Sequence, residues 1–138
     1  MKHRNRKLAG LLLGAYTLLL SYWMLVGFGR KVTHQRYMYN LKPFDTIRHY
    51  LQFDQISSMA AIINLVGNIA VFVPFGLLLP VIFQRGFLRV FLTFLSGLFV
   101  LEMTQLLSRR GSLDIDDFIL NTIGFIIGYW LQRILRYR

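Results

Sequence analysis

The chain has 138 residues, of which 55% are hydrophobic, 15% aromatic and only 16% charged, and its mean hydropathy is +0.48. So few charges exclude an ordinary soluble domain, the aromatic content excludes a disordered chain, and the lack of cysteine excludes disulfides and thiolate sites. Because basic residues beside apolar runs orient membrane proteins and meet anionic lipids, the net charge of +10 indicates membrane lipids as partners and no nucleic acid.

The first predicted element is a transmembrane helix over residues 8–28, a run of 21 residues without a charge. At 1.5 Å per residue this run makes a helix of about 31 Å, which matches the hydrocarbon core of a bilayer. The preceding segment, MKHRNRK, resembles the start of a signal peptide, but the apolar run is longer than in such peptides and no small-residue cleavage site ends it. We therefore expect an uncleaved anchor.

A short helix is predicted after this span, within the segment LKPFDTIRHYLQF. Asp45 or Thr46 can cap it, and Ile47, Tyr50 and Leu51 recur at helical spacing. We expect it to lie at the membrane interface in the first outer loop.

Three further spans follow, at about 60–83, 88–108 and 117–135. Pro74 and Pro80 predict a kink or a re-entrant segment in the first of these three. Because no repeat or linker divides the sequence, residues 1–138 form one domain. The predicted fold is an all-α membrane protein, a bundle of four transmembrane helices.

Four spans leave both termini on one side of the membrane, and basic residues indicate which side. With the N-terminus inside, nine lysines and arginines are cytoplasmic and seven are outside. The dense cluster Lys2, Arg4, Arg6 and Lys7 precedes the first helix, which usually dominates orientation. We therefore expect a multi-pass protein of the bacterial cytoplasmic membrane with both termini in the cytoplasm.

Polar residues within the spans converge on the outer half of the membrane. Because successive helices run in opposite directions, each brings polar side chains to the same layer, and such side chains are costly in lipid unless they have a role. The predicted ligand-binding cluster consists of Asn64, Asn68, Glu102, Gln105, Arg109, Asp114, Asp117 and Asn121.

Several of these residues also have a structural interpretation. Asn68 can hydrogen-bond across helices, Glu102 can form a salt bridge or a hydrogen-bonded neutral acid, and Asp117 can cap a helix. Outside the cluster, Arg110 is expected to be an interfacial anchor, Asp116 to be solvated, and the GxxxG pair Gly124 and Gly128 to form a close-packing face.

The motifs along the chain resemble the VanZ-like family of membrane proteins. They are NLKPF at 40–44, NLVGNIAVFVPFGLLLP at 64–80, the run from Glu102 through Gln105 to Arg109, and DIDDFILNTIGFIIG at 114–128. The family residues carried over are Asn64, Asn68, Pro74, Gly76, Glu102, Gln105, Arg109, Asp114, Asp117, Asn121 and Gly124. The founding member is associated with low-level teicoplanin resistance, so the resemblance implies a role in the bacterial envelope.

Three functions remain open at this point. The first is a membrane module that binds a lipid-linked cell-wall intermediate or a lipoglycopeptide, with Arg109 holding a phosphate or carboxylate. The second is an intramembrane enzyme with Glu102 or Asp117 as general acid or base and Arg109 stabilising negative charge. The third is a transporter or flippase subunit, which the apolar inner half disfavours. We favour the binding module and expect no metal or other cofactor.

Overall fold

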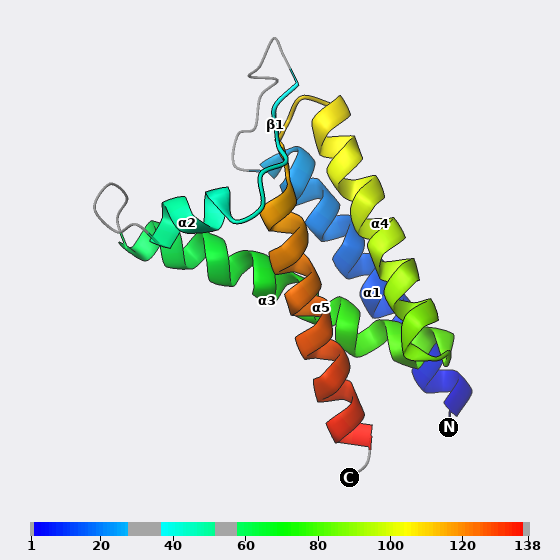
Figure 1. Ribbon diagram of the computed structural model, residues 1–138. Helices are drawn as coiled ribbons and strands as arrows, with labels where there is room; N and C mark the ends of the chain where they lie inside the picture. Colours follow the sequence, from blue (N-terminus) through cyan, green and yellow to red (C-terminus); the bar gives the residue numbers. More distant parts are fainter. Residues whose placement is uncertain (1, 28–36, 52–57, 137–138) are drawn as a thin grey trace.

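The structure is a computed structural model that describes residues 2–27, 37–51 and 58–136. It is helical apart from one two-residue strand pair (Figure 1). Four helices are long and apolar enough to cross a membrane, which confirms the predicted class of membrane protein. The elements in chain order are α1 (Lys2–Leu25), β1 (Tyr39–Asn40), α2 (Asp45–Leu51), α3 (Ser58–Phe83), α4 (Phe87–Leu107), β2 (Leu113–Asp114) and α5 (Ile115–Arg136).

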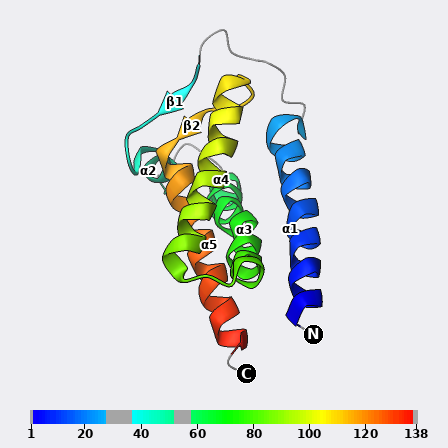
Figure 2. The ribbon, with the colours of Figure 1, turned by 90° about the vertical axis from the view of Figure 1, so that its right-hand side faces the viewer.

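The four long helices run so that the start of α1 and the end of α5 lie at the same end of the molecule (Figures 1 and 2). The outer faces of these helices carry many exposed large apolar side chains, including Leu11 and Leu18 on α1 and Val100 on α4. Such surfaces suit a hydrocarbon solvent, because lipid tails are as apolar as leucine.

The centre of the bundle is the crossing of α3 and α5. At Gly124 a Cβ atom would collide with the carbonyl oxygen of Ile69, and at Gly128 with that of Val73. On the α3 side, Gly76 meets the backbone of α5 in the same way. Only glycine permits this separation, so the predicted close-packing face of α5 is confirmed and α3 is its partner.

Aromatic side chains fill the space beside this crossing. The rings of Phe94 on α4 and Phe125 on α5 stack with centroids 4.3 Å apart, and Phe72 on α3 packs edge-on against Phe94. Helix α1 joins through Tyr16, whose hydroxyl donates to the carbonyl of Val71 at 2.7 Å. The core therefore links all four long helices.

Helix α3 continues from Ser58 to Phe83 through both of its prolines. The re-entrant alternative predicted for this segment is therefore wrong, because the chain does not reverse within it. Helices in membranes tolerate proline when neighbouring groups satisfy the backbone carbonyls that the missing N–H leaves free.

Residues 37–51 pack against the start of α5. Strand β1 pairs in parallel with β2, with Tyr39 opposite Leu113 and Asn40 opposite Asp114. Helix α2 forms where the sequence predicted a short helix. Its location at a membrane surface stays a prediction.

Candidate functional site

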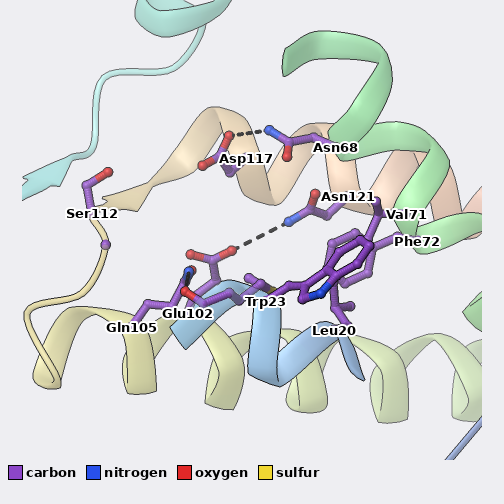
Figure 3. Close-up of a pocket in the computed structure, with 12 residues that line it drawn as sticks. Leu20, Trp23, Asn68, Val71, Phe72, Glu102, Gln105, Ser112, Asp117 and Asn121 are labelled. Atoms are coloured by element: carbon purple, nitrogen blue, oxygen red, sulfur yellow. Dashed lines mark hydrogen bonds between the residues drawn. The ribbon is translucent and has the colours of Figure 1, made fainter. Parts of the chain in front are cut away.

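A cavity of about 420 Å³ lies among α1, α3, α4 and α5, on the side of the bundle where α5 begins (Figure 3). One wall is apolar and comes from α1 and from Val71 and Phe72 of α3, and the other is polar and comes from Asn68 of α3, from α4, from α5 and from the loop between α4 and α5. The lining residues are Leu20, Trp23, Met24, Asn68, Val71, Phe72, Glu102, Gln105, Gly111, Ser112, Asp117 and Asn121.

Glu102 and Asn121 form the buried polar centre of this cavity, and each is only 2% exposed. The Nδ2 of Asn121 donates to Oε1 of Glu102 at 3.5 Å, which is a long and weak hydrogen bond (Figure 3). Among the described residues, Oε2 of Glu102 and Oδ1 of Asn121 have no hydrogen-bond partner. A buried acceptor without a donor costs about 1–3 kcal/mol, so a ligand that supplies donors would be stabilised here.

A second polar pair closes the cavity between α3 and α5. The Nδ2 of Asn68 donates to Oδ1 of Asp117 at 2.7 Å (Figure 3). The close glycine contacts two and three turns further along α5 bring the two helices near enough for this bond. Asn68 therefore holds α3 against α5, as expected of a polar side chain that bonds across helices.

The end of α4 fixes the end of α1. Gln105 is buried, and its Nε2 donates to the carbonyl of Met24 at 3.0 Å. Arg110 donates from Nη1 to the carbonyl of Leu25 at 3.0 Å. The last carbonyls of a helix have no partner within it, so these two side chains satisfy them and hold α1 at the cavity.

The acidic run at the start of α5 begins with a helix cap. Asp114 accepts from the backbone N–H of Asp116 at 2.9 Å through Oδ1, which is the geometry of an N-cap residue. Its Oδ2 accepts from the hydroxyl of Thr46 at 2.5 Å. Because the helix begins at Ile115, the cap is Asp114, and the structural alternative that made Asp117 the cap is wrong.

Asp116 has a role that the sequence did not reveal. It is fully buried, and its two oxygens accept from the backbone N–H groups of Phe44, at 2.6 Å, and of Ile47, at 3.0 Å. It thus caps α2 from another helix, and the prediction of a solvated side chain is wrong. The sequence held no local signal for this contact, because Phe44 and Ile47 lie about 70 positions before Asp116 and the sequence offered Asp45 or Thr46 as the cap.

Five of the eight predicted ligand-binding residues line the cavity: Asn68, Glu102, Gln105, Asp117 and Asn121. The structure does not bring the other three into it. Asn64 is exposed on α3, and Asp114 is occupied as the cap of α5. Arg109 lies in the turn after α4, with a left-handed backbone (φ 55°) and its guanidinium 4.9 Å from the ring centre of Tyr37.

The cavity is therefore rich in hydrogen-bond acceptors. Two carboxylates face it, and no lysine, arginine or histidine is among the described residues that line it. In the described part of the chain, no three histidine, aspartate or glutamate side chains come close enough to hold a metal ion. The sequence did not single out Trp23, Met24 or Ser112 as lining residues, because their positions depend on how α1 and the α4–β2 turn pack.

The sequence of this chain is similar to that of known proteins of one family. A sequence profile described as VanZ/LLP1 matches residues 9–136. Protein VanZ of Enterococcus faecium is 34% identical over 96 residues, which are 69% of this chain and 52% of that protein, so the chain spans about half the length of this curated relative. No solved structure matches. With its family motifs at the cavity and at the crossing of α3 and α5, the chain belongs to the VanZ-like family of membrane proteins.

Proposed function

We propose that this protein is a binding module of the bacterial cytoplasmic membrane that holds part of a lipid-linked cell-wall intermediate or a lipoglycopeptide in the cavity around Glu102. Through this binding it contributes to glycopeptide tolerance, specifically to teicoplanin. With both termini in the cytoplasm, the cavity lies in the outer half of the membrane, where such molecules are found. The similarity to Protein VanZ supports the link to glycopeptides.

The observation that carries the proposal is the pair of buried acceptors without donors, Glu102 Oε2 and Asn121 Oδ1. Sugar hydroxyls, amides and ammonium groups are donors that satisfy such atoms. A negatively charged group does not suit the same place, because the described residues of the lining include two carboxyl groups and no basic side chain. We therefore assign the cavity to a donor-rich sugar or amine and not to a phosphate held by Arg109.

The size and the apolar wall of the cavity support the same class of ligand. About 420 Å³ is at the lower end of small-molecule sites, so the cavity accommodates one sugar or a comparable head group of a larger molecule. Leu20, Val71 and Phe72 lie opposite the polar wall and offer apolar surface to the ligand's hydrocarbon part. The rest of the ligand would extend along the membrane.

A second candidate is an intramembrane enzyme that acts on a lipid-linked envelope intermediate. The observation in its favour is that Glu102 and Asp117 face the same cavity, as an acid and a base would. The absence of a described cation in the lining removes the predicted role of Arg109 in stabilising negative charge there. The binding module therefore remains the better supported function.

The proposal is tested in cells that depend on this protein for tolerance. Glu102→Gln should return the minimum inhibitory concentration of teicoplanin to that of cells without the protein, while the amount in the membrane stays unchanged. Thr104→Ala, on the same helix but outside the cavity, is the matched control and should keep tolerance. Equal tolerance with Glu102→Gln and with the original chain would contradict the proposal.

A further inference from the structure

The cavity around Glu102 has an unbalanced set of ionisable groups. Two carboxyl groups line it, that of Glu102, which is buried, and that of Asp117, which is half-buried. No basic side chain is among the described residues of the lining. The basic residues next along the chain are Arg109 and Arg110, of which the first packs on an aromatic ring and the second donates to the last turn of α1. The described wall of the cavity is therefore acidic.

This imbalance distinguishes between the classes of donor that could bind. Two carboxyl groups that share a site oppose each other's ionisation, and burial adds to the cost of their charge. A neutral hydroxyl or amide would satisfy a buried acceptor but would leave both of these costs in place. A cation offsets them, and its hydrogen bonds to a carboxylate are about twice as strong as neutral ones. Among donor-rich groups, the wall therefore favours a positively charged one.

The atoms that would receive this cation are Glu102 Oε2 and Asn121 Oδ1. Both are buried, and neither has a hydrogen-bond partner among the described residues. The two side chains already meet, with Asn121 Nδ2 3.5 Å from Glu102 Oε1, so one small group beside this contact can reach both oxygens. A primary ammonium has three N–H donors and no acceptor, which suits two acceptors at once. Asp117 already accepts from Asn68, so it contributes its charge.

The apolar wall of the cavity is also compatible with a cation. It includes two aromatic side chains, the buried Phe72 and the exposed Trp23 (Figure 3). Aromatic rings attract cations to their faces, and tryptophan does so most strongly. The same side chains offer apolar surface to the carbon atoms that carry an amine.

We propose that the group held at Glu102 is a protonated primary amine, whose N–H groups bind Glu102 Oε2 and Asn121 Oδ1. An amino sugar and the alkylamine side chain of a peptide both carry this group. The inference rests on the proposed function, whose cavity it uses, and it narrows the ligand from any donor-rich group to a cation.

The test compares amines with matched neutral molecules on the full chain in a neutral detergent, by the shift of the thermal unfolding midpoint. Glucosamine is paired with N-acetylglucosamine, and cadaverine with pentanediol, at a pH where the amines carry their protons. Each amine should bind at least about ten-fold more tightly than its neutral partner, as expected for a charged hydrogen bond. Tighter binding of glucosamine than of cadaverine would assign the amine to a sugar, and the reverse to an alkyl chain.

Glu102→Gln should remove the preference for the amines without lowering the unfolding midpoint of the protein alone. Thr104→Ala is the matched control, because Thr104 is exposed on the same helix outside the cavity, and it should keep the preference.

Two results with the original chain would overturn the proposal, whatever the variants do. One is equal binding of the amines and their neutral partners, as expected if Glu102 is a neutral acid whose proton bonds to Asn121 Oδ1. The other is the lack of any shift with both amines. Either result would leave the proposed function standing, because the tolerance of cells with Glu102→Gln is measured without these probes. Unchanged tolerance together with a clear preference for amines would refute the proposed function alone.

Discussion

Replacement of Gly124 by alanine tests whether the crossing of α3 and α5 positions the cavity. The added Cβ would collide with the carbonyl oxygen of Ile69, which is a backbone atom and cannot turn away. Inserting a methyl group into such a contact costs typically 1–3 kcal/mol, whereas the change from glycine to alanine within a helix gains about 1 kcal/mol. Because the collision involves two backbones, we take the upper part of this range and expect a net loss of about 2 kcal/mol.

Gly97→Ala is the matched control, because a Cβ at Gly97 meets nothing within 4 Å. It should keep or raise the stability. The assay is the free energy of unfolding of both variants in mixed micelles, followed by helical circular dichroism during titration with a denaturing detergent. If the Gly124 variant were as stable as the Gly97 variant, the helices could separate without cost and the argument from close packing would be refuted.

Three further predictions concern the start of α5 and the topology. Asp116→Asn should lower the free energy of unfolding by about 1–3 kcal/mol, because one of the two backbone N–H groups that Asp116 caps loses its acceptor. As a control, Asp45→Asn on the exposed surface should change the free energy of unfolding by less than about 0.5 kcal/mol. Single cysteines should report the orientation: an impermeant thiol reagent on intact cells should label position 112, in place of Ser112, and leave position 5, in place of Asn5, unlabelled. Asp117→Asn keeps the oxygen that accepts from α3 and should largely keep tolerance, whereas an enzyme that used this acid would lose about 10²–10⁴-fold in rate.

The spanning helices were predictable because their signal is local. Uncharged runs of about 20 residues can satisfy their backbone only as helices in lipid, so the class of fold follows from composition and length. The helix bounds in the structure differ by a few residues from the predicted spans: α5, for example, begins at Ile115, whereas the span was predicted to begin at 117. The GxxxG pair was predictable for the same reason, since Gly124 and Gly128 share one face by their spacing alone.

The cavity was predictable in part, because alternating helix directions bring polar residues to one layer. Glu102 and Asn121 were predictable in this way because they lie within the helices. Arg109 was not, because it lies beyond the end of α4 in a turn with a left-handed backbone, and its side chain packs on Tyr37. The role of Asp116 was not predictable either, because its partners come from a segment about 70 positions earlier. Such long-range contacts have no period in the sequence.

We propose that the buried acceptors at Glu102 serve a ligand and not the fold, and the variant Glu102→Gln distinguishes these two roles. Glutamine keeps the oxygen that accepts from Asn121, and its new N–H₂ group can donate to Asn121 Oδ1, an atom without a partner in the described structure. The purified variant should therefore unfold at the same or a higher temperature than the original chain.

The same preparation, reconstituted in lipid nanodiscs, is then titrated with teicoplanin and with a glycopeptide that lacks the acyl chain. The original chain should bind teicoplanin more tightly, and Glu102→Gln should bind it at least ten-fold more weakly, the loss expected for one charged hydrogen bond of about 1.5–3 kcal/mol. Undiminished teicoplanin binding by Glu102→Gln would contradict the proposed binding role of Glu102. A lower unfolding temperature together with lost binding would show that Glu102 serves the fold, and would contradict it as well.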